Sequence, residues 1–198
     1  MKYITPLLET KRLILKKGSI LDFERVYEYD FTKLRDINGE FKFEKLDKSK
    51  LSGFDTYADN TDEVFDWIVY LKDTNEAIAN IVANRENKEL KSTELSFNMH
   101  PNYWKQGYMK ETIIKVLDFL FEFGFENVIC GYSEGNIKSR NLIVKLGFKP
   151  FKKIENAWKK DSIYITDYTY IMSKENFNLM YKQVWSICYN NNVGDLWI

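Results

Sequence analysis

The stretch from Glu94 to Glu111 constrains the fold of this chain more than any other segment. Apolar and polar side chains alternate over its first six residues, which predicts a strand with one buried face. Pro101 and Asn102 end that strand. A loop with one glycine, Gly107, follows, and a long amphipathic helix is expected to begin directly after it. The segment therefore predicts a strand, a tight loop and a helix N-terminus in immediate succession.

The expected helix has a continuous apolar face. Its members recur every three or four residues and are Met109, Ile113, Val116, Leu117, Leu120 and Gly124, with Ile114 and Phe121 widening the face. The first amides of a helix have no partner within it and carry the positive end of its dipole, so they suit a phosphate group. Lys105 and Lys110 would add positive charge beside the turn. Ordinary strand-to-helix turns of α/β proteins show the same pattern, so the anion site needs support from the rest of the chain.

Composition excludes several classes of protein. A chain of 198 residues with 44% hydrophobic and 16% aromatic residues suits one large globular domain. It contains 29 basic and 29 acidic side chains, which argues against a general binder of nucleic acid or of an anionic membrane. Any phosphate site must therefore be local.

Two further features concern the compartment. The first residues lack a sustained apolar run, and no apolar run is long enough to span a bilayer, so we expect neither a signal peptide nor a membrane span. Cys130 and Cys188 lack the spacing of metal ligands. Two such thiols indicate reduced cysteines in a cytoplasmic protein without a metal site.

Strand patterns recur along the rest of the chain. Strands are expected over residues 10–17, 65–71, 77–83, 127–132, 148–154 and 163–172. Charged residues predict a turn over 84–91. A second polar turn, between the last two strands, is expected to contain Asn156, Lys159, Lys160 and Asp161. Over 31–62 the pattern degrades, which leaves open a short irregular helix with loops or a mobile flap.

Three helices are expected besides the one after Gly107. Ser19 or Asp22 can cap the first, and Asn136 can cap the second, which a glycine stop ends at Gly147. The third is C-terminal, with an apolar stripe of Phe177, Met180, Tyr181, Val184, Trp185 and Cys188. A helix of this length is marginal alone in water, so it must dock on its own domain or at a subunit interface.

This order of elements predicts a single-domain α/β fold with a mixed, mostly antiparallel sheet and flanking helices. The strand ending at Met99, the long helix and the strand over 127–132 form one right-handed crossover, which makes those two strands a parallel pair. We expect the domain to span residues 1–173 and the amphipathic C-terminal segment to span residues 174–198.

Four short motifs occur in the order that is typical of one enzyme family. They are Thr10-x-Arg12-Leu13-x-Leu15, Pro101-x-x-Trp104-x-x-Gly107-Tyr108-x-x-Glu111, Asn136-x-x-Ser139 and Lys145-Leu146-Gly147-Phe148. Together they resemble the GNAT superfamily of N-acetyltransferases, and most closely its branch of ribosomal-protein N-terminal (alanine or serine) acetyltransferases. The resemblance covers residues 10–173. It implies an acyl-CoA N-acyltransferase-like fold whose central parallel strands splay apart, with acetyl-CoA as the co-substrate.

The resemblance also implies contacts with acetyl-CoA. Backbone groups of Phe97 and Met99 would bind the pantetheine arm in the splay, and Asn136 would bond to it from the later helix. The pyrophosphate would be held by the amides of Lys105, Gln106, Gly107, Tyr108, Met109 and Lys110. Ser139 would lie beside the thiol end of the cofactor.

Three positions depart from the family pattern. Trp104 stands where the family's loop usually begins with Gln or Arg, as in other members of the branch. Met109 replaces a small residue, so its side chain must point away from the cofactor. Ile143 replaces the tyrosine that protonates the departing thiolate in many relatives. The substitute donor is Ser139, for which helix capping or simple cofactor contact is the alternative.

Attack by an amine requires that the ammonium group lose its proton, so a base is expected. Glu94, on the polar side of the central strand, is one candidate, because a partly buried carboxylate can act as a base near neutral pH. Glu155, after the penultimate strand, is its rival. The alternative for Glu94 is a solvated carboxylate at the strand end.

The sequence therefore predicts transfer of an acetyl group from acetyl-CoA to a primary amine by direct attack. The acceptor is a protein N-terminus or a small molecule, and the chain is a monomer or a homodimer. A degenerate fold that binds acetyl-CoA or a partner without turnover is the alternative, which Met109 and Ile143 keep open. A nucleotide-binding module is disfavoured, because the chain has neither a P-loop Gly-Lys-Ser/Thr nor a Gly-x-Gly-x-x-Gly motif.

Overall fold

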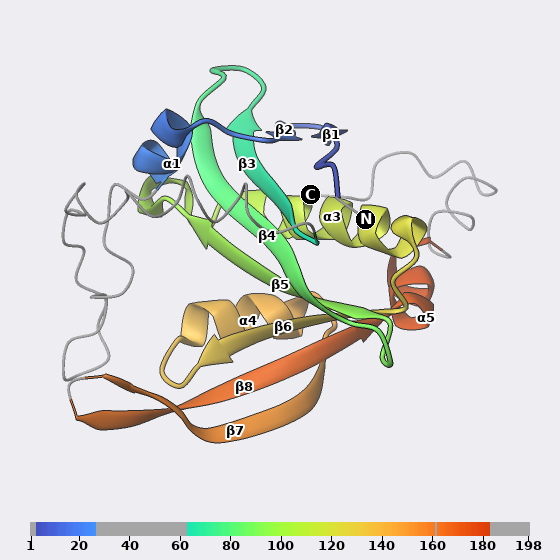
Figure 1. Ribbon diagram of the computed structural model, residues 1–198. Coiled ribbons are helices and arrows are strands. Elements are labelled where there is room, and N and C mark those ends of the chain that lie inside the picture. Colours follow the sequence, from blue (N-terminus) through green and yellow to red (C-terminus); the bar gives the residue numbers. More distant parts are fainter. Residues whose placement is uncertain (1–2, 27–62, 161, 183–198) are drawn as a thin grey trace. The chain divides into compact units, whose positions relative to one another are not determined.

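The computed structural model describes residues 3–26, 63–160 and 162–182 (Figure 1). The segment 31–62 and three members of the C-terminal stripe, Val184, Trp185 and Cys188, lie outside the described residues. The chain groups into two compact units. The first comprises residues 1–87 and 93–119, and the second comprises residues 88–92 and 120–198.

The mixed α/β fold class expected from the sequence is confirmed. The described strands are β1 (Leu8–Glu9), β2 (Leu13–Lys16), β3 (Phe65–Leu71), β4 (Ala77–Asn87), β5 (Ser92–Met99), β6 (Asn127–Ser133), β7 (Lys149–Lys160) and β8 (Ile163–Ser173). Their order in the sheet is β1-β2-β3-β4-β5-β6-β8-β7. The sheet is mostly antiparallel and contains the parallel pair β5 and β6 that the crossover predicts, while the splay of this pair stays a prediction.

Helical elements separate several of these strands. They are α1 (Ile20–Val26), the 3₁₀ turn η3 (Pro101–Tyr103), α3 (Tyr108–Phe123), α4 (Ile137–Lys145), α5 (Lys174–Phe177) and the π-helical η4 (Asn178–Lys182). At the start of α1, the Asp22 carboxylate accepts hydrogen bonds from the amide and the hydroxyl of Ser19, so both predicted capping residues take part. In the described ranges, we find no helix that is both long enough and apolar enough to cross a membrane.

The core of the first unit lies on both faces of β3. On one face, Ile68 packs with Val26 of α1. On the other, the rings of Phe65 and Trp67 meet the ring of Phe119 in α3 edge to face, with centroids 5.0 and 5.7 Å apart. Burial of each such side chain stabilises the fold by roughly 1.5–3 kcal/mol. These contacts fix α3 on the sheet and thereby fix the loop at its N-terminus.

The second unit contains an antiparallel sheet of β6, β8 and β7, with α4 along β6 (Figure 1). Its buried apolar side chains include Phe125, Val128, Cys130, Ile143, Leu146 and Met172. Further along the sheet, Tyr132 stacks on Tyr168 with ring centroids 5.3 Å apart, and Tyr170 lies 5.9 Å from Tyr132. Tyr168 and Tyr170 of β8 therefore form an aromatic cluster with Tyr132 of β6.

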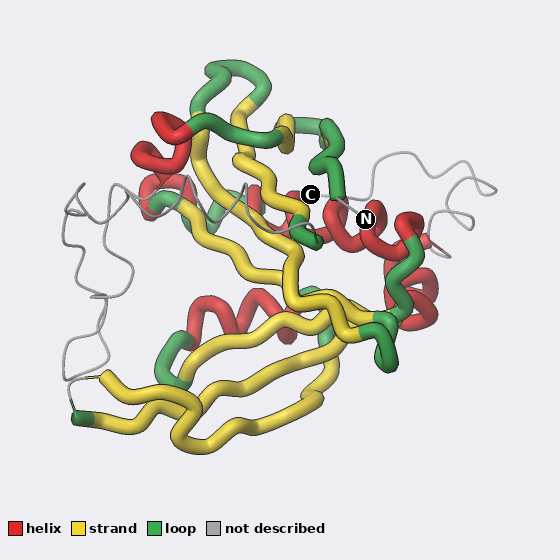
Figure 2. The backbone as a smooth tube through the Cα atoms, in the orientation of Figure 1, coloured by secondary structure: helices red, strands yellow, loops and turns green. Residues whose placement is uncertain are grey.

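Two turns differ from the prediction. β4 runs to Asn87, so the turn expected over 84–91 is reduced to residues 88–91. β7 continues to Lys160 through positions expected to form a polar turn, and the long β7–β8 hairpin is evident in Figure 2. The register shifts between Ile154 and Trp158, where Asn156 has a φ angle of 53°. Asparagine tolerates this left-handed conformation, so the polar run makes a β-bulge and does not end the strand.

The C-terminal segment also differs from a single α-helix. Helix α5 begins before Phe177, and η4 continues as π-helix to Lys182. The Phe177 ring is buried with its centroid 5.2 Å from that of Phe121, and the Tyr181 hydroxyl donates to the carbonyl of Leu146 at 3.1 Å. These contacts lie within the second unit. The division of the chain at residue 173 stays a prediction.

Candidate active site

The loop between β5 and α3 has the backbone of a tight turn. After η3, Lys105 and Gly107 both have positive φ angles, 62° and 81°, and α3 begins at Tyr108. Glycine adopts such angles without strain, which explains its presence at position 107. The predicted order of strand, loop and helix N-terminus is confirmed.

The amides of this loop have the arrangement expected of an anion site. Within the described part of the chain, no backbone carbonyl accepts a hydrogen bond from the amides of residues 105–109. The amide of Glu111 bonds to the carbonyl of Gly107 at 3.1 Å, as α3 begins. The side chain of Met109 is buried, so it does not obstruct the exposed loop. The loop thus keeps donors for a phosphate group, and its binding of pyrophosphate stays a prediction.

Trp104 fastens this loop to the end of β5. Its indole Nε1 donates a hydrogen bond of 2.7 Å to the carbonyl oxygen of Met99. Met99 is buried and Phe97 is half-buried. One lone pair of the Met99 carbonyl is therefore committed to the loop and not to a ligand. The backbone contacts of Phe97 and Met99 with pantetheine remain predictions.

The structure brings together Thr10, Arg12 and Glu111, which the sequence placed in motifs without indicating a role for them. Glu111, in the first turn of α3, accepts hydrogen bonds from the Thr10 hydroxyl at 2.5 Å and from the Arg12 amide at 3.0 Å. The Arg12 side chain forms an ion pair with the same carboxylate and donates to the carbonyl of Gln106 at 3.1 Å. Residues 10–13 form a turn, so β2 begins at Leu13 and not at Thr10 as expected.

Electrostatics keep the Glu111 carboxyl ionised. Burial acts to raise its pKa, but hydrogen bonds from Thr10 and from Arg12, together with the Arg12 charge, outweigh burial and lower the pKa. The carboxylate also lies in the first turn of α3, where the helix dipole favours negative charge. The Glu111 carboxylate therefore joins the turn of residues 10–13 to the start of α3, beside the loop that would hold the cofactor.

Helix α4 begins with the predicted cap. The side-chain oxygen of Asn136 accepts a hydrogen bond of 3.2 Å from the amide of Ser139. Contact of Asn136 with pantetheine would therefore come from its NH₂ group. Because the amide of Ser139 makes the capping contact, its hydroxyl is not required for the cap. Ile143 is fully buried, so the position of the family's tyrosine belongs to the core here.

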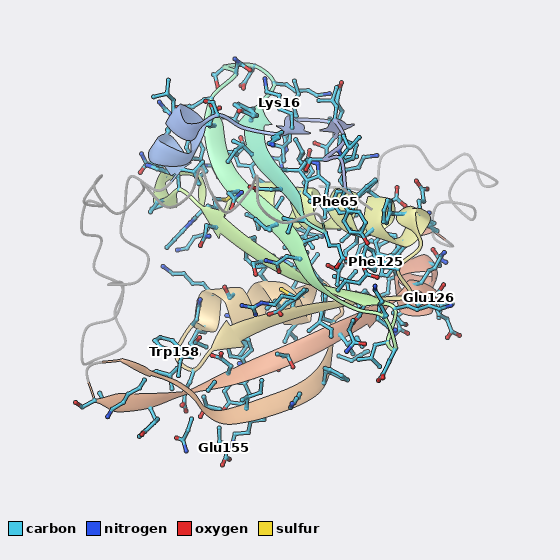
Figure 3. All side chains as sticks on the ribbon, in the orientation of Figure 1. Lys16, Phe65, Phe125, Glu126, Glu155 and Trp158 are labelled. Carbon is cyan, nitrogen blue, oxygen red and sulfur yellow. The ribbon has the colours of Figure 1, made fainter. Side chains whose placement is uncertain are left out.

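The two candidate bases both have cationic neighbours. Glu94 forms an ion pair with Arg85 at 3.0 Å, and its side chain is 31% exposed. Glu155 projects from β7 (Figure 3) and pairs with Lys153 at 2.6 Å. The hydrogen bond from Lys153 lowers the pKa of the Glu155 carboxyl. A lowered pKa makes Glu155 a weaker base near neutral pH.

The predicted site residues fall into two sets, one in each unit. The first unit contains Glu94, Phe97, Met99 and residues 105–110, and the second contains Asn136, Ser139 and Glu155. Their roles stay predictions. Over the described ranges there is no cluster of three or more His, Cys, Asp or Glu side chains that could hold a metal ion.

Comparison with known proteins identifies the family. The profile of the acetyltransferase (GNAT) domain matches residues 12–149, more than half of the chain. The chain belongs to the GNAT acetyltransferases. The matched range includes Arg12, the loop before α3 and all of α4. The family resemblance noted in the sequence is thereby confirmed, and this GNAT domain is an acetyltransferase.

Individual relatives agree with this assignment. YnaD of Bacillus subtilis, an uncharacterized N-acetyltransferase, is 27% identical over 179 residues, which cover 86% of this chain and 99% of YnaD. A GNAT-family acetyltransferase structure from Bacillus anthracis matches with a TM-score of 0.70 at 20% identity, covering 86% of this chain and 99% of that one. The ribosomal-protein-S5-alanine acetyltransferase of Vibrio fischeri matches with a TM-score of 0.64 at 13% identity, covering 87% and 98%. This GNAT domain shares the fold of both structures.

Proposed function

We propose that this GNAT domain transfers the acetyl group of acetyl-CoA to a primary amine by direct attack. The observation that carries the proposal is the loop before α3, where Gly107 has a φ angle of 81° and the amides of residues 105–109 have no carbonyl partner among the described residues. Amides at a helix N-terminus fit the diphosphate that acetyl-CoA carries between its adenosine and pantetheine parts. When bound, acetyl-CoA supplies the activated thioester.

The chain's own residues divide the work of binding and proton transfer. The amides of residues 105–110 hold the diphosphate, and the side chains of Lys105 and Lys110 add positive charge. The backbone of Phe97 and Met99 orients the pantetheine arm together with Asn136. Ser139 donates a proton to the departing thiolate. Glu94 removes a proton from the acceptor ammonium, and Glu155 is the rival base.

The acceptor we propose is the N-terminus of a protein or a small primary amine. The fold is shared with an acetyltransferase of each kind, the ribosomal-protein-S5-alanine acetyltransferase of Vibrio fischeri and the spermidine N-acetyltransferase SpeG of Vibrio cholerae. The stacked rings of Tyr132 and Tyr168 lie on the sheet of the second unit. Tyrosine faces attract ammonium groups, so this surface suits a cationic acceptor of either kind.

Calorimetry with CoA and with ATP tests the cofactor. We expect CoA to bind and ATP to bind far more weakly, and equal binding of the two would point to a nucleotide-binding module.

Gly107→Pro should abolish CoA binding, because proline fixes φ near −65° and removes one donor. Gly107→Ala and Gly124→Ala form a matched pair, since both glycines have positive φ. Gly107→Ala should weaken CoA binding, and Gly124→Ala should not. If Gly107→Pro binds CoA as tightly as wild type does, the site lies elsewhere.

A thiol-release assay tests turnover. Acetyl-CoA is offered with a panel of N-terminal peptides and small primary amines, and release of CoA thiol is measured. We expect amine-dependent release with at least one member of the panel. Binding of CoA without release for any acceptor would favour the degenerate, non-catalytic alternative.

We also propose a cytoplasmic location and either a monomer or a homodimer. The two cysteines of the sequence, Cys130 and Cys188, lack the spacing of metal ligands, and this sparse cysteine content supports a reducing compartment. Sedimentation velocity on the purified chain would distinguish the two assembly states.

A further inference from the structure

Arg12 contacts the loop and the helix that follow β5 at three places. Its Nη1 donates to the carbonyl oxygen of Gln106 at 3.1 Å, and its guanidinium lies 4.3 Å from the centre of the Tyr108 ring. Its Nε and Nη2 both lie 2.7 Å from Oε2 of Glu111. A Cβ atom at Gly107 would lie 3.4 Å from Nη2. The guanidinium thus reaches both neighbours of Gly107 and the first turn of α3.

The contact with Gln106 sets the direction of the next amide. In a trans peptide, the carbonyl of one residue and the amide of the following residue point in opposite directions. The described chain contains no cis peptide bond. Because the carbonyl of Gln106 points to Arg12, the amide of Gly107 points away from it. This amide is one of those proposed to bind the diphosphate.

Glu111 creates an electrostatic requirement at the same place. Its carboxylate lies one helical turn from Gly107, and an uncompensated negative charge there would repel a bound diphosphate. The Arg12 guanidinium supplies the compensating charge through two contacts of 2.7 Å. Thr10 adds a neutral hydrogen bond but no charge. Only Arg12 therefore both orients the loop and balances Glu111 within this group.

The Arg12–Glu111 pair keeps some contact with water. The side chains of Arg12 and Glu111 are 42% and 21% exposed, so water screens part of their attraction. We propose that Arg12 is a positioning residue for the diphosphate-binding loop, which orients the Gly107 amide and neutralises Glu111 beside the ligand. This proposal rests on the function proposed above for the loop.

The test compares two acetyl donors, of which only one carries the diphosphate. Acetyl-CoA contains it, and S-acetyl-pantetheine lacks it together with the 3′-phosphoadenosine group. Arg12→Met should raise KM for acetyl-CoA about tenfold and should leave kcat/KM for S-acetyl-pantetheine at the wild-type value. Arg12→Lys should recover part of the affinity, because lysine restores the charge but not the planar fork. Arg25→Met removes another exposed Arg–Glu pair of the same unit, with Glu76, and should change neither donor's kinetics.

Each result has a separate meaning. An unchanged KM for acetyl-CoA in Arg12→Met would overturn the proposal. Equal losses of kcat/KM with both donors would show a structural role and would also overturn the proposal. The same conclusion would follow if Arg12→Met and Arg12→Lys both had lowered melting temperatures that account for their loss of activity. If wild-type protein fails to bind CoA in calorimetry, the proposed function itself is wrong, and the inference fails with it.

Discussion

The indole nitrogen of Trp104 donates a hydrogen bond of 2.7 Å to the carbonyl oxygen of Met99, so the loop before α3 is tied to the last residue of β5. Trp104 occupies the position where the family usually has Gln or Arg. The structure gives this residue a role within the protein, since its one polar atom bonds to the backbone and not to a ligand.

Removal of this donor should loosen the loop. Trp104→Phe keeps an aromatic ring but leaves the buried Met99 carbonyl without its donor, which should cost about 1 kcal/mol of unfolding free energy and weaken CoA binding. Urea unfolding and calorimetry measure the two effects. Trp158→Phe is the matched control, because its indole also donates, at 3.1 Å, to the half-exposed Asp167. The interpretation fails if both variants lose the same stability and CoA binding is unaffected.

Ser139→Ala should lower kcat more than it weakens CoA binding. A proton donor to the thiolate acts in the transition state, and such donors commonly contribute on the order of 100-fold in rate. Stability should not change, since the capping bond uses the Ser139 amide, which alanine retains. Asn136→Ala is the contrasting variant and should cost about 1 kcal/mol of unfolding free energy. An unchanged kcat in Ser139→Ala would remove its hydroxyl from the mechanism.

The choice between Glu94 and Glu155 depends on the pH dependence of kcat/KM. We expect Glu94→Gln to flatten the rise in rate towards alkaline pH, because the variant has no carboxylate to accept the ammonium proton. Glu155→Gln should leave the profile unchanged, since Lys153 lowers the pKa of the exposed Glu155 carboxyl. If the second variant flattens the profile and the first does not, the assignment reverses.

Asp66 should make stability depend on pH. Burial raises the pKa of its carboxyl to about 6, although the amide of Asn80 and the charge of Lys17 act in the opposite direction. The folded state therefore holds the proton more tightly than the unfolded state, whose pKa is near 3.8. The unfolding free energy should fall as pH rises from about 4 to about 6, by at most about 3 kcal/mol.

Urea unfolding at pH 4 and pH 8 measures this effect. Asp66→Asn should be more stable than wild type at pH 8, and the difference should shrink at pH 4. Asparagine can still accept the hydrogen bond of 2.7 Å that Asn80 donates to this position. Asp73→Asn, in the exposed turn between β3 and β4, is the control. The prediction is wrong if wild type and Asp66→Asn have parallel pH profiles.

Much of the fold could be predicted from local patterns. Apolar spacing predicted α3, an alternating run predicted β8, and largely apolar runs predicted β3 and β4, because each pattern reflects the burial of a single element. Asn136 and Gly147 marked the ends of α4, since capping involves residues only three or four positions apart. For the same reason, Gly107 indicated the loop of the candidate site.

Other features depended on partners that are distant in the chain. The bulge in β7 looked like a turn, because Asn156 and its polar neighbours suit either structure until β8 pairs alongside. Arg12 and Glu111 are 99 positions apart, and only the packing of α3 on the sheet of the first unit brings them together. The sequence by itself therefore determined most of the elements, the loop before α3 and the family, whereas tertiary structure decided which side chains hold that loop in place. Local periodicity records which face of an element is buried, but it carries no record of which distant group will complete a hydrogen bond.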